Sequence, residues 1–172
     1  DARELIDESL QRLKLTGARI LANTQVTGLE GFVGDFTVKT TKGDIKAGAI
    51  ILAVGSGTYN PVGEYNFGMM SGVITNLKLE EMLARSDQGL ETEGRPVKTA
   101  AFVQCVGSRD RNTNPGCSRY CCATTVKQAL ALRERGINVV VYYRDMRTFS
   151  HHAEELYRKA REAGVVFVRY ND

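Results

Sequence analysis

The sequence lacks a hydrophobic run long enough to cross a membrane. Its longest apolar run, AIILAV at 49–54, is far short of the roughly 20 residues that a spanning helix needs. No charged and then apolar leader resembles a signal peptide. We therefore expect a cytoplasmic protein with no direct membrane span, which is compatible with a peripheral place on a membrane complex.

Blocks of like charge are also lacking. The 23 basic and 20 acidic side chains are interspersed, with a net charge of +3, so no nucleic-acid-binding surface is indicated. A composition of 42% hydrophobic and 25% charged residues is typical of a globular protein. The chain opens on Asp1 in helix-like sequence, so we expect an internal fragment of a longer polypeptide.

The first part of the chain predicts a helix followed by a small β-meander. Apolar residues at helical spacing precede Gly17, which indicates an amphipathic helix with a buried face; these residues are Leu5, Ile6, Leu10 and Leu13. Strand-like segments follow at 18–26, 35–41 and 44–54. The continuous apolar run at 49–54 predicts a strand that is covered on both faces.

The second part predicts an α/β lobe with a Rossmann-like βαβαβ order. A helix is expected near 79–85, and the polar, turn-rich segment 86–98 separates the lobes, so we predict domains at 1–96 and 97–172. Strands at 99–106, 137–143 and 165–170 alternate with helices at 118–135 and 153–163. Gly136 and Gly164 follow the two helices, as C-terminal caps do.

Four cysteines lie at the first strand-to-helix turn of this second lobe: Cys105, Cys117, Cys121 and Cys122. In a dinucleotide-binding domain this turn holds a phosphate, and the free N–H groups at a helix N-terminus would equally stabilise thiolates. Four soft thiolates suit a 4Fe-4S cluster or a tetrahedral zinc ion. The sequence lacks paired Cys-x2-Cys knuckles, which favours iron–sulfur over zinc, while structural disulfides, catalytic thiol exchange and four unrelated buried cysteines remain alternatives.

Three arginines flank these cysteines, at Arg109, Arg111 and Arg119. They are expected either as a solvated loop or as compensation for the negative charge of a thiolate-bound cluster. Arg144 and Asp145 follow the second strand of the lobe, where a nicotinamide ribose is often bound, but a surface ion pair is the preferred interpretation because cysteines occupy the preceding turn. His151 and His152 are expected as solvated residues at a helix start.

The run FVQCVGSRD with the later CSRYCC, together with VVVYYRDMRTFSHHAEELYRKAREAG and GVITNLKLEEML, resembles a known family. It is similar to the A subunit of heterodisulfide reductase and to the flavoprotein subunits of the quinone-interacting membrane-bound oxidoreductase. The resemblance implies an oxidoreductase subunit in which the four cysteines bind a non-standard 4Fe-4S cluster beside an FAD domain of the thioredoxin-reductase type. It also implies partner redox subunits. The cluster would transfer electrons between the flavin and these subunits.

Two departures from this family pattern matter. The ferredoxin-like cysteine insertion and the amino-terminal flavin-binding glycine motif are both absent from the sequence. A fragment without that glycine motif is expected to be inactive alone and not to retain FAD.

The segment around residue 55 is the best candidate for a second flavin contact. Ala53, Val54 and Gly55 resemble the Ala-Thr-Gly segment of two-dinucleotide-domain flavoproteins, so Gly55, Ser56 and Gly57 are predicted to bind FAD, with an ordinary turn as the alternative. Two other functions stay open for the whole chain: an FAD-dependent pyridine nucleotide-disulfide oxidoreductase with redox-active cysteines, and a non-catalytic zinc-stabilised scaffold.

Overall fold

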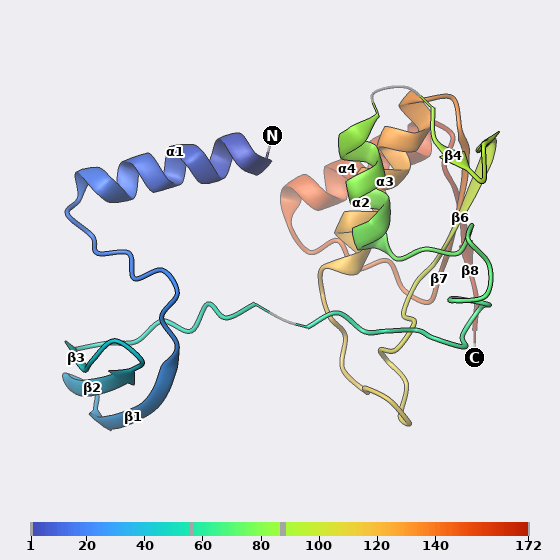
Figure 1. Ribbon diagram of the computed structural model, residues 1–172. Coiled ribbons are helices and arrows are strands. Elements are labelled where there is room, and N and C mark those ends of the chain that lie inside the picture. The colour runs from blue at the N-terminus through green and yellow to red at the C-terminus, as the bar shows by residue number, and fades with distance from the viewer. Residues whose placement is uncertain (1, 56, 87–88, 172) are drawn as a thin grey trace. The chain divides into compact units, whose positions relative to one another are not determined.

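The computed structural model describes residues 2–55, 57–86 and 89–171, and it divides the chain into two compact units (Figure 1). The first unit extends to residue 56, and the second begins at Gly57. None of the helices in the described ranges is long and apolar enough to cross a bilayer.

The first unit opens with helix α1, Ala2–Leu15. The helix ends as predicted at Gly17, whose φ of 72° is in the left-handed region that favours glycine. Its apolar residues remain accessible to solvent, with Leu5 67% exposed and Ile6 56% exposed. The predicted buried face is therefore wrong for this structure, because nothing in the described part of the unit covers it.

An antiparallel sheet follows, with strands β1 (Val26–Phe32), β2 (Asp35–Thr40) and β3 (Ile45–Ala47) in the order β1-β2-β3. Gly31 must be a glycine, because a Cβ at its φ of 97° would clash with the carbonyl oxygen of Asp35. The predicted three-stranded meander is confirmed, but its first strand is Val26–Phe32 and not the predicted 18–26. Residues 18–25 form a loop, joined to the sheet by a hydrogen bond from the Thr41 N–H to the Gln25 carbonyl.

The predicted buried strand at 49–54 is not formed. Ile51, Leu52 and Val54 are 91%, 82% and 90% exposed, and the segment has no strand conformation. A continuous apolar strand is stable only between paired neighbours with both faces covered. Within the described residues no strand pairs with this segment, so its hydrophobic pattern alone does not fix its conformation.

The second unit contains a parallel sheet in the order β6-β7-β8, formed by Thr99–Val103, Asn138–Tyr143 and Val166–Arg169. Helix α3, Cys121–Glu134, and helix α4, His151–Glu162, connect these strands and pack against each other. This confirms the α/β class and the βαβαβ order. Gly136 and Gly164, with φ of 75° and 84°, end the two helices as predicted.

The core of this unit lies between the sheet and the helices that cover it. Val126, Ala129 and Leu132 on α3 are fully buried and pack with Val139 and Val141 of β7. The apolar residues of β7 alternate in burial, as expected for a central strand that is covered more completely on one face.

Helix α2, Asn76–Arg85, and Leu90 also pack with this core. The helix contributes Leu79, and Leu90 lies just before the short hairpin of β4 (Glu91–Thr92) and β5 (Arg95–Pro96). Because both leucines are buried against the second unit, the division between units falls before Gly57 and not at the predicted boundary of 96/97. The assignment of residues 1–96 to an FAD-binding domain stays a prediction.

Replacing the α3 core residue Leu132 with alanine is expected to lower the free energy of unfolding by about 2–5 kcal/mol, because it removes a fully buried side chain and leaves a cavity. Leu77→Ala on α2, where the side chain is 60% exposed, should cost less than about 1 kcal/mol. Urea unfolding followed by circular dichroism measures both values. Equal losses for the two variants would contradict the placement of the core.

Candidate functional site

The cysteines lie where the sheet of the second unit meets α3. Pairing of β6 with β7 continues one residue beyond the strand, through the Gln104 N–H, which donates to the Tyr142 carbonyl at 2.9 Å. Cys105 then adopts a φ of 66°, and a turn closes through the Ser108 N–H and the Cys105 carbonyl at 3.2 Å. The chain therefore leaves the sheet abruptly at Cys105, at the carboxyl end of a parallel strand.

Gln104 is held in place by buried polar contacts. Its side-chain amide donates to the Thr125 hydroxyl at 2.5 Å, and that hydroxyl also accepts from Asn76 Nδ2 at 3.0 Å. Its carbonyl accepts from the Tyr170 hydroxyl at 2.7 Å. Gln104 and Thr125 are both buried, so these hydrogen bonds are formed away from water and fix the residue before Cys105.

Cys121 and Cys122 are the first two residues of α3. The residue before them, Tyr120, makes no side-chain cap, so the first N–H groups of the helix are available to the sulfurs. The Cys122 thiol, the Ser118 hydroxyl (3.0 Å from Cys121 Sγ) and the backbone N–H groups of Cys121 and Cys122 together lower the pKa of Cys121 to about 5. The structure thus favours a thiolate at Cys121.

The pKa values of Cys122 and Cys105 are raised, in contrast to that of Cys121. The Cys122 side chain is 4% exposed and lies with its sulfur 3.9 Å from the Asp145 carbonyl oxygen. Its hydrogen bond to Cys121 and its burial raise the pKa of Cys122. Burial likewise raises the pKa of Cys105, while the nearby Arg109 guanidinium opposes that rise. Near neutral pH, Cys121 is therefore expected as a thiolate, and Cys105 and Cys122 as neutral thiols.

Cys105, Cys121 and Cys122 share one electrostatic environment, since the charge of Cys121 acts on both of the other thiols and that of Cys105 acts on Cys122. The sulfur of Cys117 accepts a hydrogen bond from the Arg119 N–H at 3.3 Å, within its own loop. Because α3 begins at Cys121 and not at the predicted Ser118, Cys117 lies in the loop before the helix. All four cysteines are free thiols.

The residues that the structure describes contain no group of three or more His, Cys, Asp or Glu side chains close enough to hold a metal ion. The donor chemistry nevertheless fits a thiolate-bound cluster, because soft ligands lie at the end of a strand and at the start of the helix that follows it. The four sulfurs would have to approach one another to form one ligand set.

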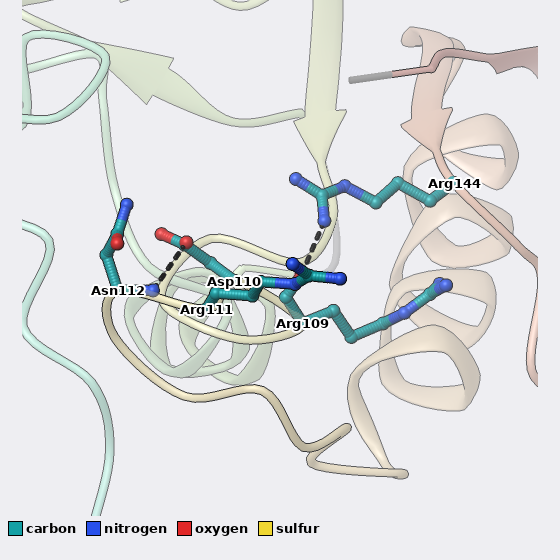
Figure 2. A pocket seen from close by; sticks show the side chains of 5 residues that line it. All are labelled: Arg109, Asp110, Arg111, Asn112 and Arg144. Atoms are coloured by element: carbon teal, nitrogen blue, oxygen red, sulfur yellow. Dashed lines mark hydrogen bonds between the residues drawn. The ribbon is translucent and has the colours of Figure 1, made fainter.

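The arginines near the cysteines divide into two groups. Arg109 is 20% exposed at its side chain and forms an ion pair with Asp145 at 2.7 Å. Arg144 donates to the Arg109 carbonyl at 2.6 Å, as Figure 2 shows. Arg111 is exposed, and Arg119 lies over the ring of Phe149, with 5.4 Å between its guanidinium carbon and the ring centroid. Of these arginines, Arg109 and Arg144 are the ones whose charge lowers the pKa of the Cys105 thiol most.

A shallow cavity of about 570 Å³ opens beside the loop that follows Cys105. The residues that line it are Arg109, Asp110, Arg111, Asn112 and Arg144 (Figure 2). Asp110 turns its carboxylate toward its own loop, where it accepts from the Asn112 N–H at 2.9 Å. The preferred interpretation of Asp145 as part of an ion pair agrees with its contacts to Arg109 and Arg169.

The predicted flavin contacts are less informative. Gly55 has a φ of 69°, which explains a glycine there from the backbone alone, and no atom lies within 4 Å of a Cβ built on Gly55 or Gly57. Ser56 lies outside the described residues. At the start of α4, His151 and His152 are exposed, as expected, while the Ser150 hydroxyl accepts from the Ala153 N–H at 3.2 Å.

Sequence reasoning missed three residues around the cysteines. Ser118 bonds Cys121, Tyr170 bonds the carbonyl before Cys105, and Tyr59 packs its ring against Gly107, where a Cβ would clash. Ser118 could have been found, because a hydroxyl three residues before a helix-start cysteine can reach its sulfur. The two tyrosines are distant in sequence from the site and carry no local signal.

The fold and the site together define the class of protein. It is a redox protein with a Rossmann-like α/β unit in which cysteines stand in place of the phosphate-binding glycines. No protein-family model matches the chain. Among curated proteins, the A subunit of the ferredoxin/F(420)H(2)-dependent CoB-CoM heterodisulfide reductase of Methanosarcina acetivorans is 37% identical over 145 residues, which cover 78% of this chain and 18% of that protein. An iron-sulfur A subunit of the CoB--CoM heterodisulfide reductase of Methanopyrus kandleri is 38% identical over 135 residues, which cover 72% of this chain and 21% of that protein.

The chain is thus similar to heterodisulfide reductase A subunits over about three quarters of its length, and this part of the resemblance seen in the sequence is confirmed. By their names these relatives are subunits of oxidoreductases, and the chain spans about a fifth of their length. The solved atypical thioredoxin reductase TRi from Desulfovibrio vulgaris Hildenborough aligns with 97% of this chain and 47% of its own, at 23% identity. Its TM-score of 0.35 is too low to establish a shared arrangement.

The low pKa of Cys121 predicts selective alkylation of the metal-free chain. A group with a lowered pKa is already charged above that value, so Cys121 should be largely thiolate at pH 6 while the raised pKa of Cys105 keeps it neutral. Iodoacetamide labelling followed by peptide mass spectrometry should therefore modify Cys121 before Cys105, with a rate that falls as the pH drops below about 5.

The matched control is Ser118→Ala, which removes one hydrogen bond to the Cys121 sulfur and leaves every cysteine in place. Its labelling profile at Cys121 should shift to higher pH. Identical profiles for the two proteins, or faster labelling of Cys105 at pH 6, would contradict the hydrogen-bonded thiolate.

Proposed function

We propose that this chain is the part of a heterodisulfide reductase-like oxidoreductase subunit that holds a 4Fe-4S cluster and transfers electrons between a flavin and partner redox subunits. The ligands would be Cys105, Cys117, Cys121 and Cys122. The observation that carries the proposal is that Cys105 at the end of β6 lies close enough to Cys121 and Cys122 at the start of α3 for their charges to act on one another.

The chemistry of the sulfurs supports this assignment. A bound cluster would supply one-electron redox chemistry, with a potential set by its ligands, hydrogen bonds and burial. Cys121 is prepared as a thiolate, whereas Cys105 and Cys122 would release protons when they bind metal, so loading should be favoured by higher pH. The Arg109 and Arg144 guanidiniums would partly offset the negative charge of the bound thiolates.

The loop between Cys105 and Cys117 gives the site a means of closing. Its ends are linked by the Arg109 N–H, which donates to the Gly116 carbonyl at 2.9 Å, so Cys117 follows directly from a fastened segment. A closer approach of Cys117 to the other sulfurs would change the stretch between Gly116 and α3.

The flavin and the partners are proposed from the relatives. Three relatives are named as iron-sulfur subunits, and the names of others include ferredoxin, F(420)H(2) or H(2) beside heterodisulfide reductase. By analogy, this chain would act beside an FAD domain, to which Gly55, Ser56 and Gly57 would contribute, and within a complex of redox subunits. A quinone-interacting complex is the other setting compatible with the sequence resemblance.

One observation favours a second candidate function, thiol–disulfide exchange. Cys121 is a low-pKa thiolate hydrogen-bonded to the neighbouring Cys122 thiol, which is the environment of a nucleophilic cysteine. Attack of Cys121 on a substrate disulfide would form a mixed disulfide and release one thiol; attack by a second cysteine would release the other thiol and leave a protein disulfide. The adjacency of Cys121 and Cys122 disfavours a disulfide between those two, because such a ring is strained.

Anaerobic reconstitution is expected to load about four irons and a matching amount of sulfide per chain. The Cys105→Ser variant should lose or convert the cluster while its circular dichroism spectrum stays unchanged, because serine is close in size to cysteine and replaces a soft ligand with a poor one. Iron analysis and visible absorption measure this outcome.

Ser118→Ala is the control for this experiment as well, because it alters the surroundings of Cys121 without removing a sulfur. It should bind iron at the wild-type level. Stoichiometric zinc with no iron uptake would support the zinc scaffold instead, and wild-type iron in Cys105→Ser would remove Cys105 from the ligand set.

The purified chain is expected not to retain FAD. A phosphate-binding glycine turn at a helix N-terminus is the main anchor for a dinucleotide, and α3 presents cysteines there instead. Absorption spectra and flavin extraction after gel filtration measure the occupancy. A yellow protein with stoichiometric flavin would show that the remaining contacts suffice.

A further inference from the structure

Asp145, the second residue after β7, contacts the cysteine site through both its side chain and its backbone. Its carboxylate accepts from Arg109 Nη2 at 2.7 Å and from Arg169 Nη2 at 3.1 Å. Its carbonyl oxygen lies 3.9 Å from the sulfur of Cys122. One residue thus contacts a cysteine of α3 and an arginine of the loop that follows Cys105.

Arg109 is the point at which that loop is fastened to the sheet. Its side chain reaches Asp145, its carbonyl accepts from Arg144 Nη1 at 2.6 Å (Figure 2), and its N–H donates across the loop to Gly116 at 2.9 Å. Its backbone φ is 58°, an unfavourable value for a residue with a Cβ, so these contacts must hold it there. The same guanidinium acts on the Cys105 thiol.

The two sides of this ion pair belong to different parts of the cysteine site. Arg109 lies four residues after Cys105, whereas Asp145 belongs to the segment after β7 against which Cys122 packs. The Arg109 side chain is 20% exposed, so this pair is less screened by water than the Arg169 contact, where the arginine side chain is 65% exposed. The contact of Asp145 with Arg109 therefore dominates.

We propose that Asp145 is a positioning residue for the cysteine site: through Arg109 it holds the loop after Cys105 against the end of β7, at the point where its own backbone meets Cys122. The proposal rests on the proposed function for its metal-binding role. The fastening of the loop itself belongs to the metal-free chain and can be measured there. Removing the carboxylate should loosen the loop, and a loosened loop should release bound iron faster.

The first experiment measures amide hydrogen exchange of the metal-free chain by mass spectrometry. In Asp145→Asn, the amides of Ser108 and Arg109, which bond within the loop, should exchange about two- to fivefold faster than in the wild type, the range expected from losing one partly exposed ion pair. Exchange in α4 should not change. Arg109→Gln should give a similar acceleration, and the double variant should add little to either single change.

The matched control is Asp110→Asn. It makes the same change of charge in the loop that carries Arg109, and the amide oxygen of the new asparagine can still accept from either the Asn112 N–H or the Thr113 hydroxyl, which both donate to the Asp110 carboxylate. Asp145→Glu, which restores a carboxylate, should recover part of the protection. Equal acceleration in Asp110→Asn, or additive effects of the Arg109 and Asp145 changes, would overturn the proposal.

The second experiment measures iron loss from the reconstituted chain after a chelator is added. Asp145→Asn should release iron about two- to fivefold faster than the wild type, and Asp110→Asn should match the wild type. If the wild type takes up no iron, the proposed function fails, but the exchange experiment still decides whether Asp145 fastens the loop. If exchange accelerates while iron loss is unchanged, Asp145 fastens the loop without serving the metal site, and the proposal is wrong.

Discussion

The position of the cysteine site depends on the pairing of Gln104 with β7 at the carboxyl end of β6. That backbone hydrogen bond carries the parallel register one residue past the strand, and the buried contacts of the Gln104 side chain and carbonyl prevent the residue from rotating. The chain must therefore turn at Cys105, in front of the N-terminus of α3. Without this anchor, Cys105 and the helix cysteines would have no fixed relation.

Two opposing effects act on the sulfurs gathered there. The uncapped helix start and the Ser118 hydroxyl favour charge on Cys121, whereas burial disfavours charge on Cys105 and Cys122. A site in which one sulfur is charged and the others are neutral avoids the repulsion of three adjacent thiolates. Arginines at the loop and at the end of β7 then provide positive charge for additional thiolates.

The second unit was largely predictable from the sequence, because its helices and strands carry regular hydrophobic periods and end at Gly136 and Gly164. The segment from Ala49 to Val54 was not, because its pattern requires neighbouring strands that the described residues do not supply. The place of the cysteines followed from the βαβ order. The contact between Arg109 and Asp145 could not be predicted, because it joins two loops that only the tertiary fold brings together.

At Cys105 the left-handed backbone favours glycine for stability, whereas a thiol at this position requires a cysteine. A residue with a Cβ at a φ of 66° is less stable than glycine by about 1 kcal/mol, so the metal-free fold would gain by losing the cysteine. Selection for stability alone would replace the whole cysteine side chain, including its Cβ, with the hydrogen atom of glycine. The retained sulfur is therefore a local cost to folding that a ligand of the thiol could offset by binding the folded state.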